Sequence, residues 1–224
     1  MSELLFNELP RPTFRWLRVN HTVSSLAGED TAVQSIAVEA NKDILSPLPV
    51  GTALLDGNYE GANKEAVHVL VEKAEGYAIN VPPKAKEVVG IRIDANARVA
   101  NRFQFIVGEG AELEVQFYVT GSGDALTNVS YLNEYDVKEA GKVVVKKVNL
   151  LPEHVQHIEH RYTKLEEKAD VEYINIEIGG SENILNYYHD LVGQESRMVH
   201  DIAYLGNKEQ KFDISMVMSH GGKK

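Results

Sequence analysis

The fold is decided by three consecutive stretches: Val171-Glu-Tyr-Ile-Asn-Ile-Glu-Ile178, then Ile184-Leu-Asn-Tyr-Tyr-His-Asp-Leu191 with its continuation from Met198 to Leu205, then Phe212-Asp-Ile-Ser-Met-Val-Met218. In the last stretch every second residue is apolar, and this period-two alternation predicts a strand with one buried face. Glycine and asparagine between the stretches predict turns, because both residues tolerate positive φ. No intervening segment is long enough for a crossover helix. The strands therefore pair as hairpins or coil as successive rungs of a β-helix.

The same pattern extends upstream to about residue 88. Leu113-Glu-Val-Gln-Phe-Tyr-Val119 is the clearest half-buried strand, and further strands are expected at 129–137, 142–150 and 154–165. Strands that recur without helices at these spacings suit either stacked rungs or a β-sandwich. Sequence repetition is too weak to distinguish the two, so both remain open from periodicity alone.

The first 75 residues differ from the rest. Residues 62–73 predict a helix with Asn63 as its N-cap, and residues 35–39 predict a strand or a short helix. The lone Trp16 is expected to pack its segment onto the main body. We therefore predict a partly helical N-terminal region at 1–75 and a β-helix core at 76–224.

Composition narrows the function classes. The formal net charge is −10, so long-range electrostatics disfavour nucleic acid and anionic membranes as partners. The 224 residues contain no cysteine, which excludes disulfides, thiolate metal ligands and a cysteine nucleophile from this chain. No apolar run approaches the roughly 18 residues that span a bilayer, and the N-terminus lacks signal-peptide character. A cytoplasmic protein is expected.

Four stretches, in this order, resemble the SufB/SufD family of iron–sulfur cluster assembly proteins. They are Leu9-Pro10 followed by Arg15-Trp16-Leu17-Arg18, the segment from Ala66 to Pro82, Val107-Gly108-Glu109-Gly110-Ala111 to Gln116, and the run from Gly179 through Gly206 to His220. The resemblance spans most of the chain and implies a mainly β fold. That fold is a right-handed parallel β-helix with a short, partly helical N-terminal region.

The resemblance also implies a role and partners. It points to a non-catalytic, SufD-like scaffold that works with a SufC-type ATPase and a thiol-bearing SufB-type subunit, and that carries at most a transient iron–sulfur cluster. The family's later rungs and ATPase-docking helices have no counterpart before Lys224, which weakens the expectation of ATPase docking. A β-helix that ended there would expose unpaired strand edges, so a homodimer or other homo-oligomer is expected.

Six histidines are candidate metal ligands. His154, His157 and His160 lie within one short segment, and imidazole is a good ligand for iron or zinc. On a strand, His157 points away from the other two, so ligation by all three is not expected; we expect exposed or partner-facing side chains.

The other three candidates are His189, His200 and His220. Asp190 and Asp201 follow the first two directly, but adjacent residues of a strand point to opposite faces, so neither carboxylate orients its neighbouring imidazole. His220 aligns with a histidine of the family pattern.

Two alternatives remain open. A β-helical carbohydrate-binding or carbohydrate-active protein usually carries a row of acidic or basic residues along one strand face and aromatic stacking ladders, whereas the acidic residues here are scattered. A purely structural oligomer that has lost the family function is the other. Gly121-Ser-Gly123 resembles a phosphate loop only weakly, because neither a helix nor a lysine follows it.

Overall fold

The computed structural model describes residues 3–9, 20–25, 36–55, 59, 61, 63–122 and 127–221. These residues form fifteen strands and one helix. In chain order they are β1 (Glu3–Phe6), β2 (Thr22–Ser25), β3 (Ile36–Glu39), β4 (Leu45–Leu48), α1 (Lys64–Lys73), β5 (Gly76–Val81), β6 (Lys86–Asp94), β7 (Val99–Val107), β8 (Glu112–Thr120), β9 (Thr127–Val137), β10 (Lys142–Asn149), β11 (Val155–Leu165), β12 (Asp170–Glu177), β13 (Glu182–Leu191), β14 (Arg197–Tyr204) and β15 (Lys211–His220).

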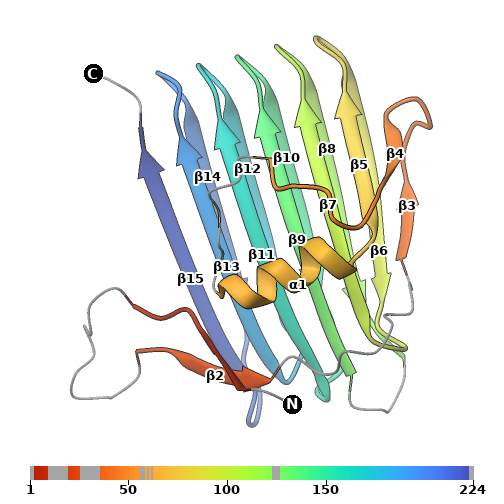
Figure 1. Ribbon diagram of the computed structural model, residues 1–224, viewed down its shortest axis with the longest axis vertical. Coiled ribbons are helices and arrows are strands. Elements are labelled where there is room, and N and C mark those ends of the chain that lie inside the picture. The colour runs from red at the N-terminus through yellow and green to blue at the C-terminus, as the bar shows by residue number, and fades with distance from the viewer. Residues whose placement is uncertain are drawn as a thin grey trace.

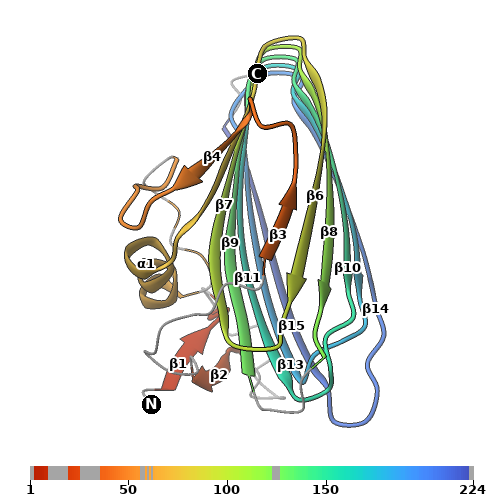
Figure 2. The same ribbon diagram turned by 90° about the vertical axis from the view of Figure 1, so that its right-hand side faces the viewer.

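The strands from β5 onward alternate between two parallel sheets. One sheet has the order β14-β12-β10-β8-β6-β3, and the other has the order β15-β13-β11-β9-β7-β5-β4. Each strand pairs in parallel with the strand two places further along the chain, so the chain coils as a parallel β-solenoid of about five turns (Figures 1 and 2). This confirms the predicted β-helix and rules out the hairpin and sandwich alternatives.

Register explains why a period-two sequence folds in this way. Equivalent inward residues stack directly, as Val89 on Val115 and Val115 on Val145, so each rung buries its apolar side chains against the rungs before and after it. A strand buried by neighbours on both sides and by the opposite sheet satisfies its backbone groups within the ladder. The interior between the sheets is therefore the core of the protein.

The turns that lead from the seven-stranded to the six-stranded sheet share one backbone conformation. Each has a residue with positive φ at an equivalent position, and these residues are Lys84, Gly110, Ala140, Lys168 and Glu195. Successive turns are joined by hydrogen bonds; for example, the Gly110 N–H donates to the Glu139 carbonyl at 2.9 Å. The turns therefore stack in register with the strands.

The N-terminal elements close one end and cover one face of the solenoid. β3 and β4 pair antiparallel with β6 and β5, and α1 lies across the outer face of the seven-stranded sheet beside β1 and β2 (Figures 1 and 2). The predicted helix is confirmed with Asn63 as its N-cap, and it ends at Lys73. Within the segment predicted as a strand or short helix, Ile36–Glu39 form a strand, and Ser35, Trp16 and Pro10 lie outside the described residues.

α1 is the single helix among the described residues and spans ten residues, too few to cross a bilayer. The outer face of the six-stranded sheet carries no described element (Figure 2). At the far end of the solenoid, β14 and β15 have one free edge each within the described part of the chain.

Candidate functional site

The interior changes character along the solenoid. Inward positions on β6 and β8 are apolar, as in Val89 and Phe117, whereas the same positions on later strands hold charged and polar groups. Lys147 stands in register with Phe117, for instance. The charged residues of this interior network are Lys147, Glu159, Arg161 and Glu177, and none has more than 1% of its side chain exposed.

Lys147 joins the two carboxylates of the network. Its Nζ lies 2.5 Å from Glu159 Oε2 and 2.6 Å from Glu177 Oε1, so strands β10, β11 and β12 are linked across the interior. A buried charge is costly unless it is paired and hydrogen-bonded, and one ammonium group serves two carboxylates here.

Glu159 has the richest set of partners. Arg161 donates two hydrogen bonds to its Oε1, from Nη2 at 2.6 Å and from Nε at 3.1 Å, and Asn133 donates a third at 3.0 Å. Tyr131 and Tyr187 donate to Oε2 at 3.3 Å each. Burial alone would raise the pKa of Glu159, but Arg161 and Lys147 hold that pKa well below its usual range.

The Arg161 guanidinium is held between two aromatic rings. Its Cζ lies 4.3 Å from the ring centre of Tyr173 and 4.4 Å from that of Tyr187, which is cation–π geometry on both sides. Burial disfavours the cation, yet Glu159 opposes that effect, and the pKa of Arg161 is raised. Arg161 therefore stays charged and immobile inside the solenoid.

Glu177 differs from Glu159 because it has fewer donors. Burial raises its pKa, the shared Lys147 lowers it, and the negative Glu159 raises it again, so the net direction is upward. The pKa values of the two interior carboxylates are thus shifted in opposite directions.

His157 belongs to the same interior. Its Nε2 lies 3.0 Å from the Tyr131 hydroxyl, and its Nδ1 lies 3.2 Å from Asn149 and from Asn183. Burial lowers the pKa of His157 to about 3, so this imidazole is neutral at ordinary pH.

The structure places the other predicted histidines in different environments. The strand geometry is confirmed, because His157 faces inward while His160 faces outward under the N-terminal elements; His189 and His200 face inward and both following aspartates face outward. The expectation of exposed or partner-facing side chains is wrong for His157 and His160, which are fully buried because the strand that carries them is covered on both faces. His189 is fully buried as well. His154 and His200 are half-buried and His220 is exposed.

No group of three or more His, Asp and Glu side chains in the described residues is arranged to hold a metal ion. Metal binding by the six candidate histidines therefore stays a prediction. The residues that sequence reasoning missed are Lys147, Arg161 and Glu177. The alternation of the strand could have revealed Lys147. Val143, Val145 and Lys147 occupy every second position of β10, so the pattern assigns this lysine to the core.

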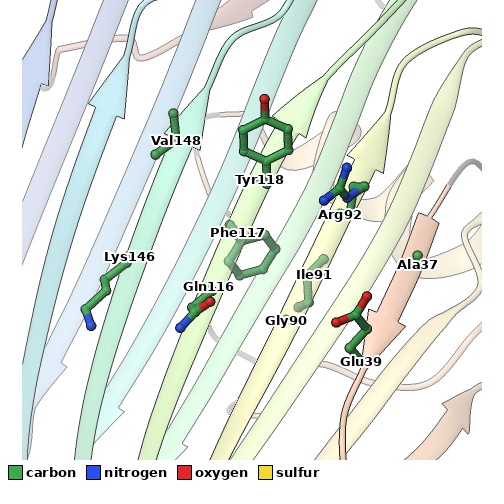
Figure 3. A pocket seen from close by; sticks show the side chains of 10 residues that line it. All are labelled: Ala37, Glu39, Gly90, Ile91, Arg92, Gln116, Phe117, Tyr118, Lys146 and Val148. Atoms are coloured by element: carbon green, nitrogen blue, oxygen red, sulfur yellow. The ribbon is translucent and has the colours of Figure 1, made fainter.

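A second feature is a shallow depression of about 370 Å³ on the outer face of the six-stranded sheet (Figure 3). Arg92 lies over the ring of Tyr118, 5.3 Å from its centre, and Lys146 and Glu39 stand on either side. Lys146 pairs with Glu114 at 2.8 Å. The lining carries charges of both signs and no nucleophile with an adjacent base, so it has the character of a solvated sheet face.

Comparison with known proteins agrees with this solenoid. The family model of the SufBD core domain, of the SUF system for iron–sulfur cluster assembly, matches residues 91–224. The chain belongs to the SufB/SufD family. Searches of curated proteins and of solved structures return no significant match.

The matched SufBD core runs from within β6 to the end of the chain and includes the whole interior network. Because the chain belongs to this family, it is involved in iron–sulfur cluster assembly. Thiolates, which are the usual protein ligands of such clusters, are missing from these 224 residues.

Proposed function

We propose that this chain is a scaffold subunit of iron–sulfur cluster assembly without catalytic chemistry of its own. The match of the SufBD core to residues 91–224 carries the proposal. The geometry supports it, because the interior charges are engaged with one another and with buried tyrosines and amides rather than open to a substrate cleft.

The missing thiol defines the first partner. A cluster is held mainly by cysteine thiolates, and this chain supplies none. A SufB-type subunit that brings the thiol would complete the site, with the cluster as its cargo. A SufC-type ATPase is the second proposed partner, and the cytoplasm is the proposed compartment.

The free end of the solenoid is the proposed docking surface for the SufB-type subunit. Within the described part of the chain, β14 and β15 present unpaired backbone groups, and Tyr204 and Leu205 beside this edge are 62% and 66% exposed. Unpaired strand edges pair readily with another chain. In the absence of a SufB-type subunit, the same edges would join two copies of this chain into a homodimer.

Mixing the purified chain with a SufB-type subunit tests this function. Light scattering after size-exclusion chromatography should show a one-to-one complex at micromolar concentration and a homodimer for the chain alone. Ile214→Pro on β15 removes a backbone N–H at the free edge, because the alternate N–H groups from Lys211 to Gly221 donate to β13, and should weaken both assemblies. The control is the surface substitution Val88→Thr on β6, which lies far from this edge and should weaken neither assembly. A chain that stays monomeric and ignores the SufB-type subunit would refute the proposal.

A further inference from the structure

Methionine and histidine recur at every second position of β14 and β15, the last described strand of each sheet, which we together call the last rung. Met198-Val-His200 lies on β14, and Met216-Val-Met218-Ser-His220 lies on β15. Spacing by two places all five of these side chains on one face of their strands. Because Met198 continues the inward position of Val171, and Met216 continues that of Tyr187, this face is the interior of the solenoid.

Register places two of the thioethers on the strand beside the residues that one imidazole contacts. The ring of His200 lies 4.7 Å from the ring of Tyr187, and its Nδ1 lies 3.2 Å from Nε2 of His189. Met216 is the partner of Tyr187 on the adjacent strand, and Met218 is the partner of His189. Neighbouring strands lie about 4.8 Å apart, so both methionines lie on β15 directly beside the two β13 residues that His200 contacts.

The His200 imidazole has one ring nitrogen that is available as a metal ligand. Nε2 of His200 and Nδ1 of His189 are both buried without a hydrogen-bond partner, and His189 is fully buried. When His200 donates its Nδ1–H to Nε2 of His189, its own Nε2 carries a lone pair. A metal-ligating histidine commonly donates its second N–H to a neighbour in this way, which fixes the ring orientation and tautomer.

We propose that the last rung binds one soft monovalent metal ion, Cu(I), through Nε2 of His200 and the thioether sulfurs of Met216 and Met218. Thioether and imidazole donors without a carboxylate select Cu(I) over hard or divalent ions. Met216 and Met218 are 37% and 42% exposed in the described part of the chain, so an ion can reach their sulfurs.

The surrounding charges favour a monovalent ion. Arg161 is close enough to His200 to lower the pKa of that imidazole, although burial is the larger cause. Arg161 and Lys147 oppose Glu159 and Glu177, so the nearby network has no excess negative charge to compensate a divalent ion. Zn²⁺ and Fe²⁺ should therefore bind here more weakly than Cu(I).

Silver(I), a closed-shell substitute for Cu(I), allows the donors to be read directly. The chain alone is titrated with Ag(I) while the methionine methyl signals are followed by NMR, and Cu(I) is titrated anaerobically against a chromophoric chelator. We expect one bound equivalent, with shifts at the methyl groups of Met216 and Met218 and none at Met198, which lies two residues from His200 along β14.

Variants separate this site from mere packing, since methionine also fills irregular gaps in cores. Met216→Leu and Met218→Leu conserve volume, and each should raise the dissociation constant for Cu(I) at least about tenfold. His200→Phe keeps the aromatic contacts and should abolish binding. Met198→Leu is the matched control and should leave the affinity unchanged.

The inference rests on the terminal rung rather than on the scaffold role, so either can fail alone. Absence of Ag(I) and Cu(I) binding would overturn it. Retention of binding in the Met216→Leu, Met218→Leu double variant would also overturn it, as would displacement of Cu(I) by equimolar Zn²⁺. If His200→Phe fails to fold by circular dichroism, the double variant and the methyl shifts still decide the question.

Discussion

At the scale of single residues, Glu159 concentrates the electrostatics of the interior. Glu159→Gln keeps the shape but leaves Arg161 without its partner carboxylate and Lys147 with Glu177 alone. Breaking a buried ion pair in this way costs about 3–5 kcal/mol. The free energy of unfolding, measured by urea denaturation at neutral pH, should fall by that amount.

Glu114→Gln provides the surface control for this experiment. Glu114 pairs with Lys146 at 2.8 Å on the outer face of the six-stranded sheet, and its side chain is 31% exposed. Exposed pairs contribute less than about 1 kcal/mol, so the control should change stability little. Equal losses for the two variants would contradict the assignment of the interior network.

At the scale of elements, the stacked turns give a matched pair of substitutions. Gly110 and Ala140 occupy the same position in successive turns with φ of 62° and 54°. A side chain in the left-handed region costs roughly 1–2 kcal/mol, so Ala140→Gly should stabilise the protein and Gly110→Ala should destabilise it by up to that amount. The midpoint of thermal unfolding measures both.

Space does not complicate the comparison. A Cβ on Gly110 would meet only the Cγ of Lys84 at 3.7 Å, an ordinary contact, so backbone conformation alone sets the sign. Shifts of the same sign for both substitutions would show that the turns do not share one conformation in solution.

The elements also show what the sequence could and could not predict. Alternation predicted the strands, and Asn63 predicted the start of α1, because both signals are local. The shared turn conformation was hidden, since Lys84, Gly110, Ala140, Lys168 and Glu195 have no common side-chain chemistry. Parallel stacking rather than hairpin pairing was likewise beyond local reasoning, because both arrangements need the same period of two.

At the scale of the whole molecule, buried histidines make stability depend on pH. Burial lowers the pKa from 6.5 to about 3, 4, 3 and 2 for His157, His160, His189 and His200 respectively. The unfolded chain therefore binds protons first as pH falls, and acidification favours unfolding. The raised pKa of Glu177 has the opposite effect, because acidification favours its protonated folded form, but Glu177 is one group and the histidines are four.

The urea midpoint should therefore decrease steadily between about pH 7 and about pH 5, well above the range in which carboxylates usually titrate. His160→Leu should make that slope shallower by about one proton, because both nitrogens of His160 are buried without a partner. A midpoint that does not change across this range would mean that the histidines are exposed in solution.

The interior network marks the limit of sequence reasoning about the site. The resemblance placed the chain in its family, and the family model agrees. Neither could show that Lys147 pairs with both Glu159 and Glu177, because these three residues lie on three different strands and only the coiling of the chain brings them together. A charged residue in the apolar phase of a strand is the signal that such a contact exists.

Anaerobic reconstitution with iron and sulfide tests the scaffold account most directly. Visible absorption is recorded for this chain alone, for a SufB-type subunit alone and for their mixture. The account predicts that cluster absorption requires the thiol-bearing subunit and increases when this chain is added. A stable cluster of equal yield on this chain alone, or no effect of this chain on the SufB-type subunit, would contradict it.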